Sequence, residues 1–204
     1  MSSSTATPPV YFGPFEVTNQ VFLTTPHSFA LVNLKPLLPG HVLVCPTRPH
    51  RRLTELSPPE LTDLFCAVQR VQRMLARHYF PSSPPPDNGS AGSFNIALQD
   101  GPEAGQTVPH VHVHVIPRIR GSTAKDAETP SDELYERMAD EDGNVGGWLW
   151  DAERKVVGGE RPRPGGEFPR IEDAERRPRS MEEMEREAEV FRGVLRAMEA
   201  EEGG

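Results

Sequence analysis

Three histidines alternate with three valines near the middle of the chain, as His110-Val-His112-Val-His114-Val115. Successive side chains of an extended strand point to opposite faces, so this pattern predicts three imidazoles on one face and three valines on the other. The ordinary pKa of histidine is about 6.5, so a neutral ring nitrogen is available near pH 7. Such a nitrogen can bind a metal ion, attack an electrophile or move a proton. The face is therefore a candidate reactive site.

A metal site is one use for such a face. Metal–nitrogen bonds are only about 2.0–2.1 Å long, whereas the outer two side chains start ~13 Å apart on a straight strand. Two of the histidines could share an ion easily, but the third could not, and another ligand would have to come from Gln99, Asp100 or Glu103. We therefore expect no metal held by the protein, although a zinc enzyme and a purely structural histidine face stay open as alternatives.

Nucleophilic catalysis on phosphate suits the pattern better. A neutral imidazole can attack phosphorus to form a phosphoramidate, which divides one difficult displacement into two easier steps. His112 is the expected nucleophile, because His110 and His114 flank it and can donate hydrogen bonds to phosphoryl oxygens. The loop just upstream can bind an anion through main-chain N–H groups, a hydroxyl and an amide. Its residues are Gly105, Gln106, Thr107 and Val108.

Short apolar segments predict the strands that position these residues. They are residues 20–25, 28–34, 41–45, 93–99 and 108–116. A turn rich in proline and glycine separates the second and third segments, so these two are expected to form an antiparallel hairpin. Pro117 is expected to end the histidine strand.

Two helices have clear start signals. Ser57, Pro58 and Glu60 match a capping box with proline at the first helical position, and this helix is expected to end before Pro81. Its apolar stripe is expected to pack on a sheet and consists of Leu61, Leu64, Phe65, Val68, Val71 and Leu75. A second capping box starts at Ser180. The stripe that follows could pack on the domain or on a second subunit, and consists of Met184, Ala188, Phe191, Leu195 and Met198.

Charge divides the chain into two parts. Residues 1–120 hold nine basic residues, seven acidic residues and all seven histidines, whereas residues 121–204 hold 13 basic and 23 acidic residues. Glycine and proline are frequent in the second part, which argues against a packed core there. The expected organisation is a disordered tail at residues 1–9, a folded domain at 10–120, a largely disordered acidic insertion at 121–178 and a C-terminal helix at 179–204.

Composition excludes several classes of protein. The net charge of −8 opposes binding of DNA or RNA by bulk attraction. No apolar run approaches the ~18 residues of a membrane-spanning helix, and no secretory signal is visible. The two cysteines, Cys45 and Cys66, are expected to be buried apolar residues in a reducing compartment. We therefore expect a cytoplasmic protein, with the nucleus as a second compartment.

The histidine segment and three neighbouring stretches carry a resemblance. His110–Val115 is similar to the signature of the histidine triad superfamily of nucleotide hydrolases and transferases. The stretches Gln99–Val108, Ser28–Asn33 and Lys35–Pro46 resemble the branch of the fragile histidine triad proteins, which are bis(5′-adenosyl)-triphosphatases. The resemblance runs from about Tyr11 to Arg118.

The resemblance implies a fold and a reaction. The fold would be α+β, with an antiparallel sheet of five strands, one long helix packed on it and a C-terminal helix, and residues 10–120 would be the catalytic domain of a homodimer. His112 would attack the α-phosphorus of diadenosine triphosphate, or of a related dinucleoside polyphosphate, to form a histidyl-AMP intermediate and release ADP. Water would then release AMP.

The resemblance also implies roles for other residues. His110 and His114 would bind phosphate oxygens and assist the leaving group, and Asn33 would hydrogen-bond the ribose. Gln99 and residues 105–108 would hold the phosphates, whereas His41 would support the site without contacting substrate. Mg²⁺ or Mn²⁺ would travel with the substrate phosphates, and no organic cofactor is implied.

Two other functions stay open at this stage. One is a nucleoside phosphoramidase or adenylyl transferase of the same superfamily. The other is a binding module that senses a dinucleotide and recruits partners through the acidic insertion. An asparagine at position 112 would separate the second function from catalysis, because it would remove turnover and leave binding intact.

Overall fold

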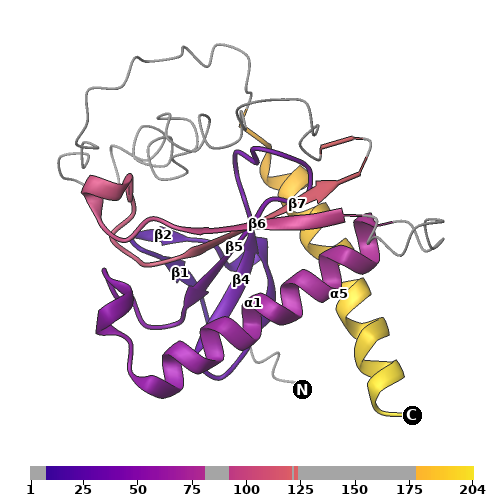
Figure 1. Ribbon diagram of the computed structural model, residues 1–204, viewed down its shortest axis with the longest axis horizontal. Helices are drawn as coiled ribbons and strands as arrows, with labels where there is room; N and C mark the ends of the chain where they lie inside the picture. The colour runs from indigo at the N-terminus through magenta and orange to yellow at the C-terminus, as the bar shows by residue number, and fades with distance from the viewer. Residues whose placement is uncertain (1–7, 81–91, 121, 124–177) are drawn as a thin grey trace, which may run out of the picture.

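A five-stranded antiparallel sheet forms the centre of the molecule in the computed structural model, which describes residues 8–80, 92–120, 122–123 and 178–204 (Figure 1). Its strands, in spatial order, are β3 (Val21–Thr24), β4 (Ser28–Val32), β5 (Val42–Pro46), β7 (Val113–Ile119) and β6 (Gly92–Leu98). A small hairpin of β1 (Tyr11–Phe12) and β2 (Phe15–Glu16) precedes the sheet. Short 3₁₀ turns lie at Thr18–Gln20, Leu53–Glu55 and Pro102–Ala104.

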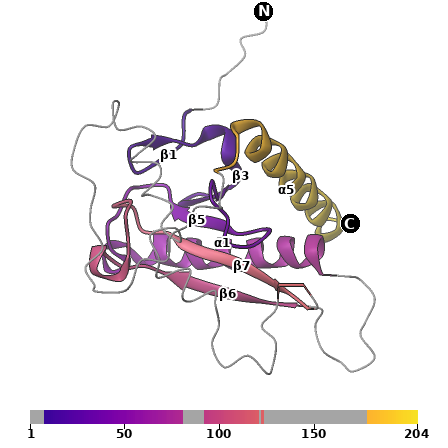
Figure 2. The same ribbon diagram turned by 90° about the horizontal axis from the view of Figure 1, so that it is seen from above.

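Two long helices, α1 (Pro58–Tyr79) and α5 (Met181–Glu202), pack on one face of this sheet (Figures 1 and 2). Both begin with the predicted capping boxes, at Ser57 and Ser180. The α5 stripe packs on α1, β3 and β4, so the domain itself covers it. This arrangement confirms the expected α+β fold, including the antiparallel pairing of β4 with β5.

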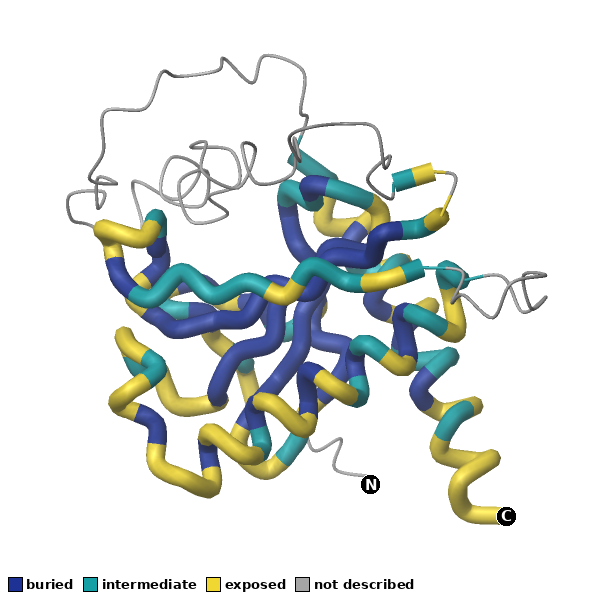
Figure 3. Tube along the Cα trace, in the orientation of Figure 1, coloured by how far each residue is buried: buried dark blue, intermediate teal, exposed yellow. Residues whose placement is uncertain are grey.

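The buried stripe of α1 differs in part from the predicted one. Leu61 and Phe65 are 38% and 45% exposed, whereas Ala67 and Met74 are buried in the core beside Leu64. Figure 3 shows buried and exposed residues alternating along α1. The helix therefore presents a face to the sheet that is rotated toward Ala67 and Met74, and it leaves two large apolar side chains in solvent.

The histidine strand begins later and ends later than predicted. β7 starts at Val113, because the main chain before it bonds to loops: the His110 N–H donates to Val108 and the Val111 N–H donates to the carbonyl of His50, at 2.7 and 2.6 Å. At the other end, β7 runs through Pro117 to Ile119. Pairing with β5 ends at Val115, so Pro117 lies where β7 has β6 as its paired neighbour, and a strand tolerates proline where one side has no partner.

Side-chain alternation still separates histidines from valines. Val111, Val113 and Val115 lie in the core beneath the helices. His114 is paired with Leu43 of β5, and residues directly opposite on neighbouring strands share a face. Leu43 belongs to a second apolar cluster, on the face away from the helices, with members Phe12, Phe15, Val17, Val21, Phe29, Leu31, Leu43, Cys45 and Val108. The β1–β2 hairpin thus covers part of the face that carries the histidines.

Several expectations from the sequence concern residues that the structure does not describe. Most of the acidic insertion at 121–178 and most of the tail at 1–9 lie outside the described residues. Cys45 is buried as expected, but Cys66 is exposed. Within the described part of the chain, neither long helix is apolar enough over a sufficient length to cross a membrane.

Candidate functional site

His112 lies on the loop that leads into β7 and has one ring nitrogen fixed by the main chain. Its Nδ1 lies 2.9 Å from the carbonyl oxygen of His110, and since a carbonyl oxygen only accepts, Nδ1 carries the proton. In the neutral ring Nε2 then keeps its lone pair. The ring packs edge-on against Phe12, with centroids 5.0 Å apart, and against His114 at 4.8 Å. His112 is therefore held as the tautomer that can act as a nucleophile through Nε2.

His114 is held in the opposite tautomer by His41. The main-chain N–H of Leu37 donates to His41 Nδ1 at 3.1 Å, so the proton of neutral His41 resides on Nε2. That Nε2 lies 2.9 Å from His114 Nδ1, which must accept and leaves the proton of His114 on its own Nε2. This atom is buried and has no hydrogen-bond partner among the residues that the structure describes. His114 thus presents an unused donor, which suits a phosphoryl oxygen.

His110 differs from the role expected for it. Its Nδ1 accepts a hydrogen bond from the Gly13 N–H at 3.0 Å, and its Nε2 donates to the carbonyl of Pro46 at 2.7 Å. With both nitrogens engaged by the main chain, the ring is not free to donate to phosphate oxygens. Its place suits support of His112, since the His110 carbonyl fixes the tautomer of that ring.

All three imidazoles are held neutral by burial. Desolvation lowers the pKa of His110 to about 4 and lowers the pKa of His112. For His114, burial and then the neighbouring rings of His112 and His41 hold the pKa well below its usual range. A neutral His112 is required for attack, so these surroundings keep the nucleophile ready at and below pH 7.

The loop from Gln99 to Val108 lies between β6 and β7 along the chain, and some of its main-chain N–H groups form hydrogen bonds within the loop. The N–H groups of Gly105 and Gln106 donate to the carbonyls of Pro102 and Gly101, both at 3.0 Å. These two N–H groups are therefore engaged within the loop, and a role for residues 105 and 106 in binding an anion stays a prediction. The amide of Gln106 donates to the carbonyl of Arg51 at 2.9 Å, so this side chain holds two loops together.

Three further residues of this loop were singled out from the sequence. Val108 is buried in the second apolar cluster. Thr107, the residue before it, is also buried. Gln99 follows β6 and lies close to Gly105: a Cβ at position 105 would fall 2.6 Å from Gln99 Nε2. Gly105 has φ +90°, a conformation that glycine adopts at no steric cost. Glycine at this position thus lets the amide of Gln99 approach the loop.

Asn33 and His41 lie at the two ends of the turn between β4 and β5. Asn33 is 1% exposed, and its Nδ2 lies 3.3 Å from both ring nitrogens of His41. Its Oδ1 accepts from the N–H of Lys35 at 3.0 Å. Asn33 therefore contacts His41, and His41 in turn contacts His114. His41 thus supports His114, as the sequence analysis expected.

The hairpin at the start of the chain contributes residues that sequence reasoning missed. Gly13 supplies the N–H that binds His110 across 97 positions in sequence, and the Phe12 ring packs on both His110 and His112. In the sequence, Gly13 indicates a turn at this position, and in the structure it has φ +57°. No spacing rule links this turn to residue 110.

The residues that the structure describes were expected to hold no metal ion of their own, and their side chains form no cluster of metal ligands. No group of three or more histidine, cysteine, aspartate and glutamate side chains there could hold an ion. The described site consists instead of neutral imidazoles, main-chain groups and amides. It can supply a nucleophile and a hydrogen-bond donor.

The chain is similar to several known proteins. The model of the HIT domain matches residues 14–121. The chain is 41% identical to the bis(5′-nucleosyl)-tetraphosphatase [asymmetrical] of Schizosaccharomyces pombe, over 91% of this chain and 94% of that one. It is 37% identical to the bis(5′-adenosyl)-triphosphatase of Saccharomyces cerevisiae, over 92% of both chains.

A solved structure gives the same answer for the fold. The NitFhit protein of C. elegans matches 94% of this chain with a TM-score of 0.58 and 33% identity, and the match covers 31% of that longer chain. The match to the domain model and the similarity to relatives along most of their length both include the histidine segment. The chain belongs to the HIT family, whose name stands for the histidine triad.

Proposed function

We propose that this protein hydrolyses diadenosine triphosphate and related dinucleoside polyphosphates through a covalent histidyl-AMP intermediate. The names of relatives that match along more than nine-tenths of this chain support the substrate class. The observation that carries the covalent route is the hydrogen bond from His112 Nδ1 to the His110 carbonyl, 2.9 Å long. It leaves the lone pair of Nε2 available to phosphorus.

The proposed reaction has two displacement steps. In the first, a bond forms between His112 Nε2 and the α-phosphorus, while the bond from that phosphorus to the bridging oxygen breaks and ADP leaves with the bond electrons. In the second, water attacks the same phosphorus, its proton passes to solvent, and AMP leaves as the bond to His112 breaks. The Nε2–H of His114 stabilises the charge on a phosphoryl oxygen in both steps.

The length of the phosphate chain is the open variable within this proposal. One relative is named for a tetraphosphate substrate and another for a triphosphate substrate. In either substrate the attacked phosphorus bears one adenosine, so the histidine chemistry is the same. Mg²⁺ or Mn²⁺ accompanies the substrate phosphates in this proposal, and omission of both ions from the assay tests that requirement.

The covalent step predicts that the protein carries label during turnover. Full-length protein is mixed with diadenosine triphosphate labelled at both α-phosphates, quenched rapidly in base and separated from free nucleotide. We expect label on the protein within one turnover and its loss after the substrate is exhausted. A parallel reaction with the tetraphosphate compares the two substrate lengths. Rapid hydrolysis without any labelled protein would contradict the covalent route.

We also propose that the protein forms a homodimer through the side of β6. This strand is an edge of the described sheet, and the edge strand of a sheet can pair with a second chain. Ile96, 41% exposed, is paired with Val115 and so lies on the side of the helices. α1 exposes Leu61 and Phe65. The proposed interface includes these three exposed apolar side chains.

An arginine at position 96 is expected to convert the dimer to a monomer, because its charge would be buried against a second apolar surface. Sedimentation analysis of Ile96→Arg beside wild type measures this change. Val190→Arg is the matched control, since Val190 is 43% exposed on α5 and lies outside the proposed interface. A monomeric wild type, or a dimer that Ile96→Arg leaves intact, would refute the proposed interface.

A further inference from the structure

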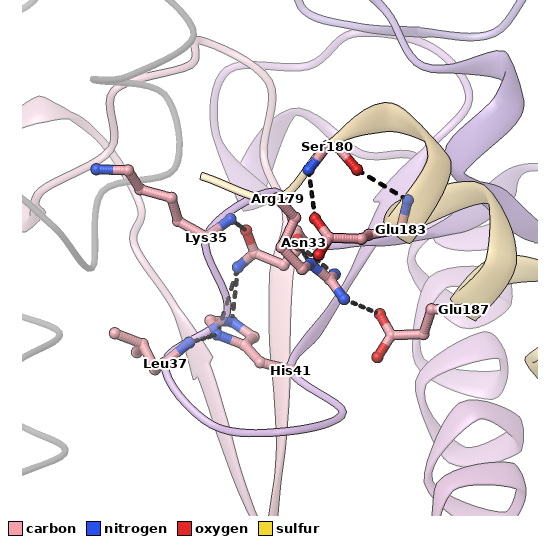
Figure 4. Close-up of polar contacts among 8 residues, drawn as sticks. All are labelled: Asn33, Lys35, Leu37, His41, Arg179, Ser180, Glu183 and Glu187. Atoms are coloured by element: carbon pink, nitrogen blue, oxygen red, sulfur yellow. Dashed lines mark hydrogen bonds and ion pairs between the residues drawn. The ribbon is translucent and has the colours of Figure 1, made fainter. Parts of the chain in front are cut away.

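A single arginine joins the start of α5 to the turn that carries Asn33 and His41. Arg179 precedes the N-cap Ser180, and its Nε donates to the main-chain carbonyl of Asn33 at 3.1 Å. Its Nη2 donates to the same carbonyl. The main-chain N–H of Arg179 donates to the carbonyl of Leu34 at 3.2 Å. Arg179 therefore makes three hydrogen bonds to the two residues that follow β4, and Figure 4 shows its contact with Asn33.

Glu187 fixes the guanidinium of Arg179. Arg179 Nη1 lies 2.6 Å from Glu187 Oε2, and the two side chains are only 18% and 19% exposed. Figure 4 shows Arg179 between Glu187 on α5 and Asn33 on the turn, with contacts to both. A planar guanidinium can hold two acceptors in a fixed geometry, which an ammonium group cannot do. The pair thus sets the position of the Asn33 carbonyl relative to α5.

The other end of the same turn is held from α1. Tyr79 lies against Gly40, which has φ +77°, and a Cβ at that position would collide with the Tyr79 ring. Tyr79 is also a neighbour of Glu187, and burial together with the Glu187 charge raises the pKa of Tyr79 to about 12. Glu187 therefore connects Arg179 with Tyr79, so the two helices hold the turn at both ends.

The side chains of this turn lead directly to the reactive histidines. Asn33 Nδ2 lies 3.3 Å from the His41 ring nitrogens, and His41 Nε2 lies 2.9 Å from His114 Nδ1. A displacement of the Asn33 peptide would therefore move one side chain expected to contact the substrate and another that fixes the tautomer of His114.

We infer that Arg179, fixed by Glu187, is a positioning residue that lets α5 set the geometry of the substrate-binding turn. Arg179 acts through Asn33 and His41 and does not itself contact substrate. The consequence for kinetics rests on the proposed hydrolase function. The consequence for the histidine rings and for binding of a mononucleotide does not depend on turnover.

The kinetic test compares Arg179 with Arg192, a second arginine that makes the same kinds of contact. Arg192 on α5 also donates through Nε and Nη2 to one main-chain carbonyl, that of Val21 at 3.2 and 2.6 Å, and it also pairs with a glutamate, Glu189. Arg179→Ala is expected to lower kcat/KM for diadenosine triphosphate on the order of tenfold to a hundredfold, mainly through KM, because a small displacement of a binding group is costly. Arg192→Ala should leave both constants near wild type.

Two further variants separate positioning from general stability. Arg179→Lys should restore only part of the affinity, because lysine cannot contact both acceptors in the arginine geometry. Glu187→Gln keeps Arg179 and weakens its anchor, so we expect the same direction of change with a smaller size. Thermal melting of all variants measures stability, and a purely structural role for Arg179 would give Arg179→Ala and Arg192→Ala the same KM.

A readout without turnover keeps the inference separate from the proposed function. Ring nitrogen signals from ¹⁵N-histidine NMR report the tautomers of His41 and His114, and calorimetry reports the affinity for AMP. In Arg179→Ala both rings are expected to shift toward mixed tautomers and AMP to bind more weakly, whereas Arg192→Ala matches wild type. Absence of hydrolysis by wild type would refute the proposed function alone. Unchanged histidine signals in Arg179→Ala would refute the inference.

Discussion

Replacement of His112 with asparagine is expected to lower kcat for diadenosine triphosphate on the order of 10⁴- to 10⁶-fold, as loss of a covalent nucleophile does in other enzymes. The asparagine amide can keep the hydrogen bond that His112 Nδ1 makes to the His110 carbonyl, but it offers no nitrogen lone pair to phosphorus. Steady-state kinetics measure the loss. Calorimetry with AMP measures the affinity, which should stay close to that of wild type.

A histidine far from the site provides the control for this experiment. His27 is exposed and precedes β4, so His27→Asn makes the same chemical change without touching the histidine network. We expect unchanged kinetics in His27→Asn, and melting temperatures close to wild type in both variants. Residual activity of His112→Asn above a thousandth of wild type would show that another group attacks phosphorus, and retained signalling without turnover would favour the binding module.

Acidification is expected to destabilise the fold in a pH window that histidine sets. Burial lowers the pKa of His110 from 6.5 to about 4 in the folded state, so between these values the unfolded chain binds a proton that the folded chain excludes. Stability therefore falls as the pH drops below about 6.5. One pKa unit corresponds to about 1.4 kcal/mol, so His110 alone accounts for about 3 kcal/mol of lost stability by pH 4. His112 and His114 add to this loss, because burial lowers their pKa values too.

Urea unfolding at pH 7.5, 6, 5 and 4 measures this dependence. His110→Gln removes the titrating group and keeps both a donor and an acceptor, so its stability should fall less over the same window. Carboxylates act at lower pH: a hydrogen bond from the Ser57 hydroxyl, with others, lowers the pKa of Glu60 from 4.5 to about 2. A loss of stability that begins only below pH 4.5 would show that the histidines do not carry the effect.

Local patterns in the sequence predicted the elements well where short-range physics determines them. Both capping boxes, the proline and glycine turn before His41 and the alternation of histidine with valine correspond to elements of the structure. The first residue of the histidine strand could not be predicted. The N–H groups of His110 and Val111 donate to carbonyls of Val108 and His50, which do not belong to a neighbouring strand. Strand propensity is the same in either case.

Long-range contacts explain what sequence reasoning missed in the site. His110 was expected to face phosphate, but Gly13 and Pro46 occupy its two nitrogens from 97 and 64 positions away. Arg179 reaches Asn33 across 146 positions. Such partners leave no spacing signal in one sequence. The tautomers of the histidines follow from long-range contacts of this kind, so the sequence alone does not predict them.

The hydrogen-bond chain that ends at His114 starts from the main-chain N–H of Leu37. Many histidines in proteins are oriented by a carboxylate, which accepts a hydrogen bond from the ring N–H and increases the basicity of the ring. A backbone amide does neither: it stays a donor at every pH at which the protein folds, and it cannot reverse the direction of the chain. His114 is thereby made a permanent source of a hydrogen bond rather than a base, which leaves attack on phosphorus to a single imidazole.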